Sequence, residues 1–289
     1  MDMQIRAISE KNNIKMAVVD ITESLAEIVK LQGTNPLTSV ALGRALINNA
    51  LISLSLKDGN KMTTNLNGMG FAGTIITEFQ NNTIRGYVEN PDFDATQISE
   101  EKGDGSPLSQ TVGTNGFLQV SRYDQDKKEP YTSRVELISG EINLDYMYYL
   151  QKSDQIHSLI TSTVEIDDKG GIEKAVGIII QLLPGYTEEN ISFIEEKVGS
   201  IDYLKKILIE TTNYEALLKD IAQDAKVLGV AELKFECTCN ENKVMDSVKM
   251  LGVEEITKAY EHGEEVEVVC DFCKKKYIIN PEKLKTLIN

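Results

Sequence analysis

Tryptophan is absent from the 289-residue chain, so its intrinsic fluorescence reports only on tyrosine. Only two histidines are present, His157 and His262, and neither is expected to bind metal because four cysteines suffice for a closed site. No stretch reaches the roughly 18 apolar residues that a membrane-spanning helix requires. The N-terminal sequence MDMQIRAISEKNNIK has no basic segment followed by an apolar one, which argues against a signal peptide. These absences predict a cytoplasmic protein that is not embedded in a membrane.

Basic residues are few relative to acidic ones. The chain has 30 Lys and Arg against 45 Asp and Glu, which gives a net charge of −15 and a pI near 4.7. Nucleic-acid binding requires clustered Lys and Arg to contact phosphates, and the one basic cluster is the short run Lys274-Lys275-Lys276. We interpret that run as a solvated strand edge. The composition therefore argues against nucleic acid as a partner and favours an acidic surface that keeps the protein in solution.

Several enzyme motifs are also missing. The sequence contains no phosphate-binding G-x-x-x-x-G-K-[ST] loop, no H-E-x-x-H motif and no G-x-S-x-G motif. Gly68, Gly70 and Gly73 match the spacing of a dinucleotide-binding loop, but β-like sequence follows where that motif requires a helix. We expect these glycines to form a tight turn between strands. The protein is predicted to be neither an enzyme nor an ATP-driven machine.

Residues 1–184 mix strand and helix patterns in a way that favours an α+β core domain. Thr22 is expected to cap a helix that ends at Gly33, and Pro36 to open a second, buried helix. A Gly- and Ser-rich stretch at residues 100–116 is predicted to be a surface loop. Strands are predicted at residues 3–9, 14–21, 61–66, 73–79, 83–88, 117–124, 131–138, 156–167 and 173–185, and helices at 21–33, 36–59 and 139–155.

Residues 185–231 are predicted to form a helical linker, because the strand pattern stops before them. Ile191, Ile194 and Val198 fit one helical face, with charged residues between them. Helices this short are marginal in isolation, so they must dock on another part of the protein. The linker is therefore a candidate for a weakly held segment.

Residues 232–289 are predicted to form a small C-terminal domain. The sequence EEVEVVCDFCKKKYIIN alternates apolar and polar residues on either side of a sharp turn, which indicates a β-hairpin. Asn280 as N-cap and Pro281 as the first helical residue then start a terminal helix. A domain with so few large apolar residues cannot rely on its core alone, and a bound metal ion is the natural supplement.

All four cysteines of the chain lie in this C-terminal domain. Cys237 and Cys239 form a C-x-C pair, and about thirty residues later Cys270 and Cys273 form a C-x-x-C pair. Two close pairs can supply the four sulfur ligands of a tetrahedral Zn²⁺ site, with one ion per chain. The alternative is four unrelated buried thiols, which the paired spacing disfavours. We therefore predict that these four cysteines are zinc ligands.

Spacing alone leaves more than one role open for this site. Structural zinc ribbons usually use two C-x-x-C turns, whereas Cys237-Thr238-Cys239 is tighter. Either close pair can also be bridged by a disulfide without moving distant backbone, provided that its Cα separation permits. A plain zinc ribbon, a redox switch, and a thiol oxidoreductase that uses Cys270 and Cys273 are all consistent with the spacing. The last lacks the βαβ context of a catalytic C-x-x-C motif.

The chain resembles the redox-regulated heat shock protein 33 family of bacterial holdase chaperones. The resemblance extends over nearly the full length, and its most specific element is the C-x-C pair followed by the C-x-x-C pair. Other matching segments are GRALINNALISLSLK (43–57), the glycine turn 68–73, RGYVENP (85–91), YTSRVELISGEI (131–142), YYLQKSDQI (148–156) and GIIIQLLPG (177–185). The resemblance implies an α+β core for client binding and dimerisation (1–184), a helical linker (185–231) and a zinc-binding redox-switch domain (232–289).

The resemblance also implies a function. The reduced, zinc-bound form of such a protein is a poor chaperone. Oxidation would join Cys237 to Cys239 and Cys270 to Cys273, release zinc and unfold the C-terminal region. The surface exposed in this way would bind unfolding client proteins without ATP during oxidative stress, and the active oxidised form would be a homodimer. The alternative function is a constitutive zinc-ribbon module for protein interaction, without redox switching.

Overall fold

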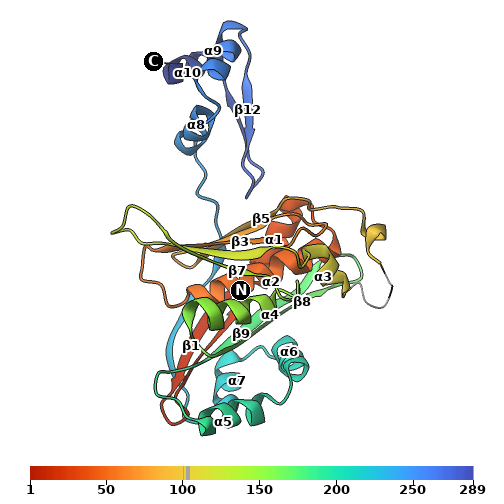
Figure 1. Ribbon diagram of the computed structural model, residues 1–289, viewed down its shortest axis with the longest axis vertical. Helices are drawn as coiled ribbons and strands as arrows, with labels where there is room; N and C mark the ends of the chain where they lie inside the picture. The colour runs from red at the N-terminus through yellow and green to blue at the C-terminus, as the bar shows by residue number, and fades with distance from the viewer. Residues whose placement is uncertain (100, 102–104, 289) are drawn as a thin grey trace. The chain divides into compact units, whose positions relative to one another are not determined.

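The computed structural model describes residues 1–99, 101 and 105–288. The chain divides into two compact units, Met1–Phe235 and Glu236–Asn289, which are described separately below. The fold class is α+β, as predicted, because the strands form antiparallel sheets and the helices are grouped rather than alternating with them (Figure 1). Among the described residues, no helix combines the length and the apolar character needed to cross a lipid bilayer.

The first unit contains a five-stranded sheet, called sheet A, with strand order β10-β1-β2-β9-β8. All of its neighbouring strands are antiparallel. Its strands are β1 (Met3–Ser9), β2 (Ile14–Asp20), β8 (Ser158–Ile166), β9 (Ile172–Leu182) and β10 (Lys226–Glu232).

A six-stranded sheet, called sheet B, has the strand order β11-β5-β4-β3-β6-β7. Its two-residue edge strand β11 runs parallel to β5, and the other neighbours are antiparallel. The glycine-rich segment between β3 and β4 is a turn, as predicted. The strands are β3 (Lys61–Asn67), β4 (Ile75–Gln80), β5 (Thr83–Val88), β6 (Phe117–Tyr123), β7 (Tyr131–Glu136) and β11 (Lys234–Phe235).

Helices fill the space between the two sheets. The central helix α2 (Pro36–Ser53) is buried along almost its whole length, because it packs on strands of both sheets. Pro36 stands at its first turn and Asn35 Oδ1 accepts the Thr38 N–H (3.0 Å), so the predicted start is confirmed. The helical segments of the chain up to β8 are, besides α2, α1 (Thr22–Gln32), the exposed η1 (Ala95–Gln97), α3 (Pro107–Val112), α4 (Asn143–Tyr149) and the π-helical η2 (Leu150–Asp154).

Strand periodicity gives sheet A two buried faces. In β2, Ala17 and Val19 face the core between the sheets, whereas Met16 and Val18 face the opposite side. Successive side chains of a strand alternate between faces, so a nearly continuous apolar strand signals burial on both. Three short helices cover the second face (Figure 1): α5 (Glu188–Val198), α6 (Ile201–Glu210) and α7 (Tyr214–Ile221).

The second unit contains the predicted hairpin and terminal helix. Asn280 Oδ1 accepts the Lys283 N–H (3.0 Å) and caps the terminal helix. The core of this unit is small: its fully buried apolar residues are Val244, Val248, Ile256, Ile279 and Leu284. The elements are α8 (Glu241–Lys249), α9 (Val253–Glu261), β12 (Val266–Val269), β13 (Lys276–Ile279) and α10 (Pro281–Ile288).

The predicted N-cap of α1 is wrong. Thr22 is the first helical residue, and Ile21 occupies the N-cap position without a side-chain cap. The carboxylate of Asp2 accepts the N–H groups of Glu23 (2.8 Å) and Ser24 (2.7 Å) instead. A carboxylate satisfies two of the free N–H groups at once and is favoured by the helix dipole, but its distance in the sequence hides it from a local pattern.

Three predicted boundaries also need correction. The stretch 100–116 contains helix α3, whose Leu108 and Val112 are buried; residues 100 and 102–104 of that stretch lie outside the described part. The second helix ends at Ser53 and not at residue 59. The predicted helical linker, residues 185–231, ends in strand β10, which pairs with β1.

Candidate metal centre

The cysteines lie on two short segments of the second unit. Cys237 and Cys239 follow β11 and precede α8, and Cys270 and Cys273 occupy the turn between β12 and β13. The hairpin turn is closed by backbone hydrogen bonds: the Cys270 N–H donates to the Lys275 carbonyl (3.0 Å) and the Lys274 N–H donates to the Cys270 carbonyl (2.8 Å). Both sulfurs of the C-x-x-C pair are therefore presented by one rigid turn.

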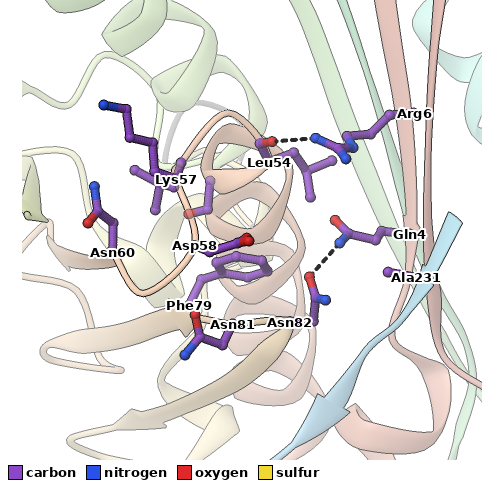
Figure 2. A pocket seen from close by; sticks show the side chains of 12 residues that line it. Gln4, Arg6, Leu54, Lys57, Asp58, Asn60, Phe79, Asn81, Asn82 and Ala231 are labelled. Carbon is purple, nitrogen blue, oxygen red and sulfur yellow. Dashed lines mark hydrogen bonds between the residues drawn. The ribbon is translucent and has the colours of Figure 1, made fainter. Parts of the chain in front are cut away.

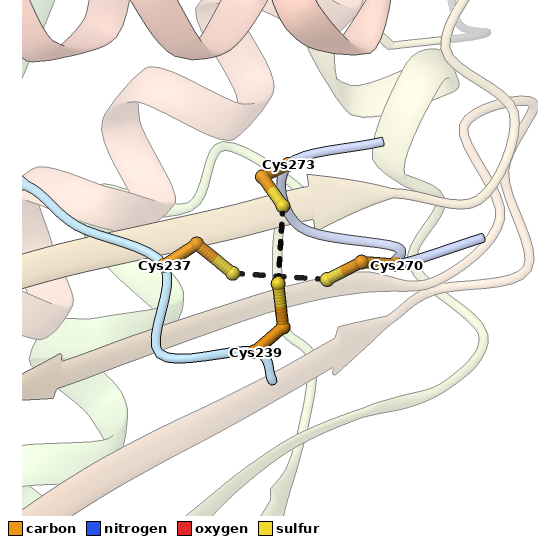
Figure 3. A group of neighbouring side chains, drawn as sticks. All are labelled: Cys237, Cys239, Cys270 and Cys273. Atoms are coloured by element: carbon orange, nitrogen blue, oxygen red, sulfur yellow. Dashed lines mark hydrogen bonds between the residues drawn. The ribbon is translucent and has the colours of Figure 1, made fainter. Parts of the chain in front are cut away.

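The structure brings the four sulfurs together, as Figure 3 shows. All four Sγ atoms lie within 4.8 Å of one another; Cys237 and Cys270 are 3.7 Å apart, and Cys239 and Cys273 are 3.4 Å apart. Sulfurs at about 2.3 Å from a tetrahedral zinc ion would stand about 3.8 Å apart. The cluster therefore has the size of a closed four-sulfur zinc site, and all four thiols are free of disulfides.

The surroundings of the thiols shift their pKa values in different directions. Desolvation raises the pKa of Cys237, and it raises the pKa of Cys273 to about 12. Desolvation acts in the same direction on Cys239, but hydrogen bonds from the Tyr277 hydroxyl and the neighbouring thiols outweigh it and lower the pKa of Cys239 to about 7. Compared with Cys237 and Cys273, Cys239 therefore has the stronger support for a thiolate, the form that binds metal and reacts with oxidants.

Polar contacts fix the C-x-C segment. The Lys243 Nζ donates to both the carbonyl (2.9 Å) and the hydroxyl (3.0 Å) of Thr238, the residue between the two cysteines. Asn240 directly after the pair caps α8 by accepting the Lys243 N–H (3.0 Å). The start of α8 and its first basic side chain therefore hold the chain in the bend that turns both sulfurs inward.

The histidines take no part in this cluster, whose candidate ligands are cysteines alone. His157 precedes β8 in the first unit and stacks at a tilt on Tyr186, with ring centroids 5.3 Å apart. His262 follows α9 and its exposed ring lies 3.9 Å from a Glu264 carboxylate oxygen. The donor set is purely sulfur, which suits zinc and disfavours hard cations such as Mg²⁺.

The first unit contains a polar cavity of about 370 Å³ between β1, the end of α2 and the turn after β4 (Figure 2). On its walls, Gln4 donates to the Asn82 side-chain oxygen (2.6 Å) and Arg6 donates to the Leu54 carbonyl (3.2 Å). Asp58 contributes a carboxylate, and no histidine or cysteine is among the described residues that line it. The Ser53 hydroxyl also lines the cavity, but it donates to Asn49 Oδ1 (3.3 Å) and not to a base that could activate it.

Sequence reasoning missed two side chains that contact the cysteine segments, Tyr277 and Lys243. The Tyr277 hydroxyl donates to the Cys239 sulfur (3.2 Å) from β13. A tyrosine in a strand and a lysine in a helix are ordinary residues at those positions. The available signal was proximity to a candidate ligand in the sequence: Tyr277 lies four residues after Cys273 and Lys243 four residues after Cys239.

Fold and site together define a class of protein: an α+β body joined to a small unit built around a four-thiol centre that fits zinc and redox chemistry. A family model described as Hsp33 protein matches residues 2–280. The chain is 33% identical to the 33 kDa chaperonin of Lactobacillus johnsonii over 99% of this chain and 98% of that protein. It is 30% identical to the 33 kDa chaperonin of Bacillus subtilis over 99% and 98%.

A solved structure agrees with these relatives. The crystal structure of the 33 kDa chaperonin (heat shock protein 33 homolog) from Thermotoga maritima matches with a TM-score of 0.86 and 27% identity, over 99% of this chain and 97% of that one. The chain therefore belongs to the Hsp33 family. The resemblance found in the sequence is confirmed, and the relatives are named for chaperone activity, which is not an enzymatic function.

Proposed function

We propose that the protein is a redox-regulated, ATP-independent holdase chaperone. The observation that carries the proposal is the four-thiol cluster, in which every sulfur lies within 4.8 Å of the others. That geometry suits one zinc ion when the thiols are reduced. For the oxidised form, the family resemblance implies disulfides within each close pair of the sequence, Cys237 with Cys239 and Cys270 with Cys273. Binding of unfolding client proteins is the function that the chaperone relatives support.

The reduced state depends on Cys237, Cys239, Cys270 and Cys273 as ligands. Zinc, when bound, supplies a cross-link between the C-x-C segment and the hairpin turn, with an apparent free energy of about 10–16 kcal/mol. The remaining support of the second unit is its small apolar core. Whole domains are stable by only about 5–15 kcal/mol, so the four thiolates would hold most of the stability of this unit.

Oxidation by a peroxide converts each close pair of thiolates to a disulfide in two steps. A thiolate attacks one peroxide oxygen, the O–O bond breaks, and the sulfur becomes a sulfenic acid while hydroxide leaves. The second thiol of the pair then attacks the sulfenic sulfur, an S–S bond forms and water leaves. Two peroxides accept four electrons from four thiols, giving the Cys237–Cys239 and Cys270–Cys273 disulfides and leaving no thiolate to bind zinc.

Client binding would follow from unfolding of the second unit and loosening of helices α5–α7. Disulfides across such short spacings constrain only tiny loops and cannot replace the metal, so the second unit would unfold. Helices α5–α7 are short and cover an apolar face of sheet A that includes Met16, Val18 and Ile178. Loosening of these helices would expose an apolar surface able to hold unfolding proteins. We further propose a cytoplasmic location, a homodimeric active form, and a three-part division at residues 1–184, 185–231 and 232–289, in which the end of the middle part is strand β10 and not helix.

One experiment joins zinc, oxidation and activity. The reduced, zinc-loaded protein is treated with peroxide and mild heat, while a chromophoric chelator reports zinc release and light scattering reports aggregation of a heat-labile client. We expect one zinc per chain, release on oxidation and suppressed aggregation, all reversed by reductant plus zinc. Cys273→Ser should weaken zinc binding, whereas the control His262→Ala should not. Zinc release without any gain in holding activity would contradict the proposal.

The second candidate is a constitutive zinc-ribbon module for protein interaction. The hydrogen-bonded turn that carries Cys270 and Cys273 favours it, because such turns are common in purely structural zinc sites. This candidate predicts that zinc stays bound through the peroxide treatment and that binding to partner proteins does not depend on oxidation. The peroxide experiment described above, which follows zinc release and client aggregation, therefore separates the two functions.

A further inference from the structure

Tyr277 lies on the same face of β13 as the buried Ile279, and its ring packs on the core of the second unit. Strand alternation places this ring beside the cysteine cluster. Its hydroxyl donates to the Cys239 sulfur at 3.2 Å. The backbone of β13 is paired in register with β12, where Val268 stands opposite Tyr277. The hydroxyl is thus aimed at one sulfur by a strand and a packed ring, both of which restrict its movement.

The thiol of Cys273, which faces Cys239 across the cluster, has a different environment. The sulfur of Cys273 is hydrogen-bonded by the backbone N–H of Lys275, within the hairpin turn itself. Cys239 has the tyrosine hydroxyl in addition to the neighbouring thiols. Cys239 and Cys273, 3.4 Å apart across the cluster, therefore differ in a side-chain donor that a single substitution can remove.

We propose that Tyr277 is a positioning residue that restrains the reactivity of Cys239 in the zinc-bound protein and so sets how readily the switch is triggered. This inference rests on the proposed function. A zinc-bound cysteine is already a thiolate, so the hydrogen bond cannot raise its thiolate fraction further. The bond draws electron density from sulfur and lowers its nucleophilicity toward the peroxide oxygen. Second-shell donors of this kind also orient a ligand and typically change metal affinity or activity about 10–100-fold.

The test compares Tyr277→Phe with Tyr260→Phe, a control on α9 in the same unit whose ring lies near the Lys285 ammonium. Each zinc-loaded protein receives limiting iodoacetamide, and mass spectrometry identifies the first cysteine modified. We expect the ratio of Cys239 to Cys273 modification to rise on the order of tenfold in Tyr277→Phe, and zinc release by peroxide to accelerate. The control should retain the wild-type ratio.

A purely structural role for Tyr277 predicts a different pattern. Loosening of the hairpin would raise modification of all four cysteines together, as we expect for Val268→Ala, which removes packing opposite the ring and keeps the hydroxyl. An unchanged Cys239 to Cys273 ratio in Tyr277→Phe would overturn the inference while leaving the proposed function intact. Wild-type protein that binds no zinc would overturn both.

A second variant keeps the test decisive should Tyr277→Phe fail to bind zinc. Replacing Tyr277 with 3,5-difluorotyrosine keeps the ring and makes the hydroxyl a stronger donor. Measured below the pKa of the fluorinated phenol, this protein should modify Cys239 more slowly than wild type, with the Cys273 rate unchanged. Equal or faster modification of Cys239 would overturn the inference.

Discussion

Asp20 shows at the scale of one residue how the linker helices are attached to sheet A. Its Oδ2 accepts the Lys174 ammonium (2.8 Å) and the Tyr214 hydroxyl (2.5 Å), and its Oδ1 accepts the Thr22 hydroxyl (2.6 Å). Burial raises the pKa of this carboxyl, but these hydrogen bonds outweigh it and hold the pKa below its usual range. Tyr214 is the first residue of α7, so this charged contact joins the last linker helix to β2.

Tyr214→Phe should loosen α7 without changing the shape of its core. The substitution removes the bond to a charged acceptor, and such bonds contribute about 1.5–3 kcal/mol. Hydrogen exchange in α7 should accelerate accordingly, while exchange in sheet B stays unchanged. Tyr203→Phe is the matched control, because that side chain on α6 is 56% exposed. Equal exchange in the two variants would show that the Asp20 contact does not hold the helix.

The same carboxylate predicts a pH dependence. A carboxyl whose folded pKa is depressed stabilises the folded state above its unfolded pKa of about 3.9, and that contribution is lost as the pH falls through the folded pKa. Asp20→Asn should therefore lower the free energy of unfolding at neutral pH, and its difference from wild type should shrink below about pH 4. Urea unfolding across pH measures this. The control Asp220→Asn, at an exposed position of α7, should leave the free energy of unfolding at neutral pH close to that of wild type.

At the scale of elements, the turn between β3 and β4 is locked to the end of α3. The Gly70 N–H donates to the Val112 carbonyl (3.1 Å), and a Cβ at Gly70 would stand 2.4 Å from the backbone N of Gly113. Backbone atoms on both sides cannot move aside as a flexible side chain would. The turn therefore needs glycine for close approach, and not for nucleotide binding.

Gly70→Ala should lower the free energy of unfolding of the first unit by about 3 kcal/mol or more, at the upper end of the usual overpacking cost. The control is Gly170→Ala, in the turn between β8 and β9. Gly170 has φ +83° but nothing within 4 Å of its added Cβ, so only the backbone cost of about 1–2 kcal/mol applies. Thermal unfolding of both proteins makes the comparison. A smaller loss at Gly70 would mean that the turn can separate from α3.

Sequence pattern predicted the elements whose signal is local. Short apolar runs beside a turn identified β1 and β2, and alternation of apolar and polar residues identified the β12–β13 hairpin. Strand β10 was missed because most of its residues are exposed, so its sequence KVLGVAE shows no buried face. Its pairing is made by backbone atoms of β1, which leave no mark in the sequence. Helix α3 was missed because Ser and Gly around it read as a loop.

For the candidate site, too, the sequence predicted one part and missed another. The pairing of cysteines in the sequence predicted the cluster, since metal chemistry restricts both the residue type and the spacing. Tyr277 was not predicted, because its closeness to Cys273 in the sequence is a weak signal and its contact with Cys239, at 3.2 Å, is set by the tertiary structure. Asp2 at the start of α1 was hidden for the same reason. Candidate ligands are visible in the sequence, whereas the side chains that contact them across the fold require coordinates.

At the scale of the whole molecule, the two units should respond differently to loss of metal. The second unit has a small core and, in our proposal, depends on four thiolates; the first has two larger cores, one on each side of sheet A. Chelation of the reduced protein should therefore abolish protection of α8, α9 and α10 from hydrogen exchange. Protection of sheet B should persist. Protected α8–α10 after complete zinc removal would show that the apolar core alone suffices.

The division of the chain at Phe235 and Glu236 has a consequence in polymer terms. Folded, a segment as long as the second unit has a radius of gyration of about 10 Å, whereas the same segment unfolded extends to about 22 Å. The unfolded second unit, attached by one end to the residue after strand β11, would become a mobile chain. Its excluded volume would keep neighbouring chaperone molecules with bound clients apart. Oxidation, which in our proposal releases the metal, would then also produce a flexible chain that sterically opposes coaggregation.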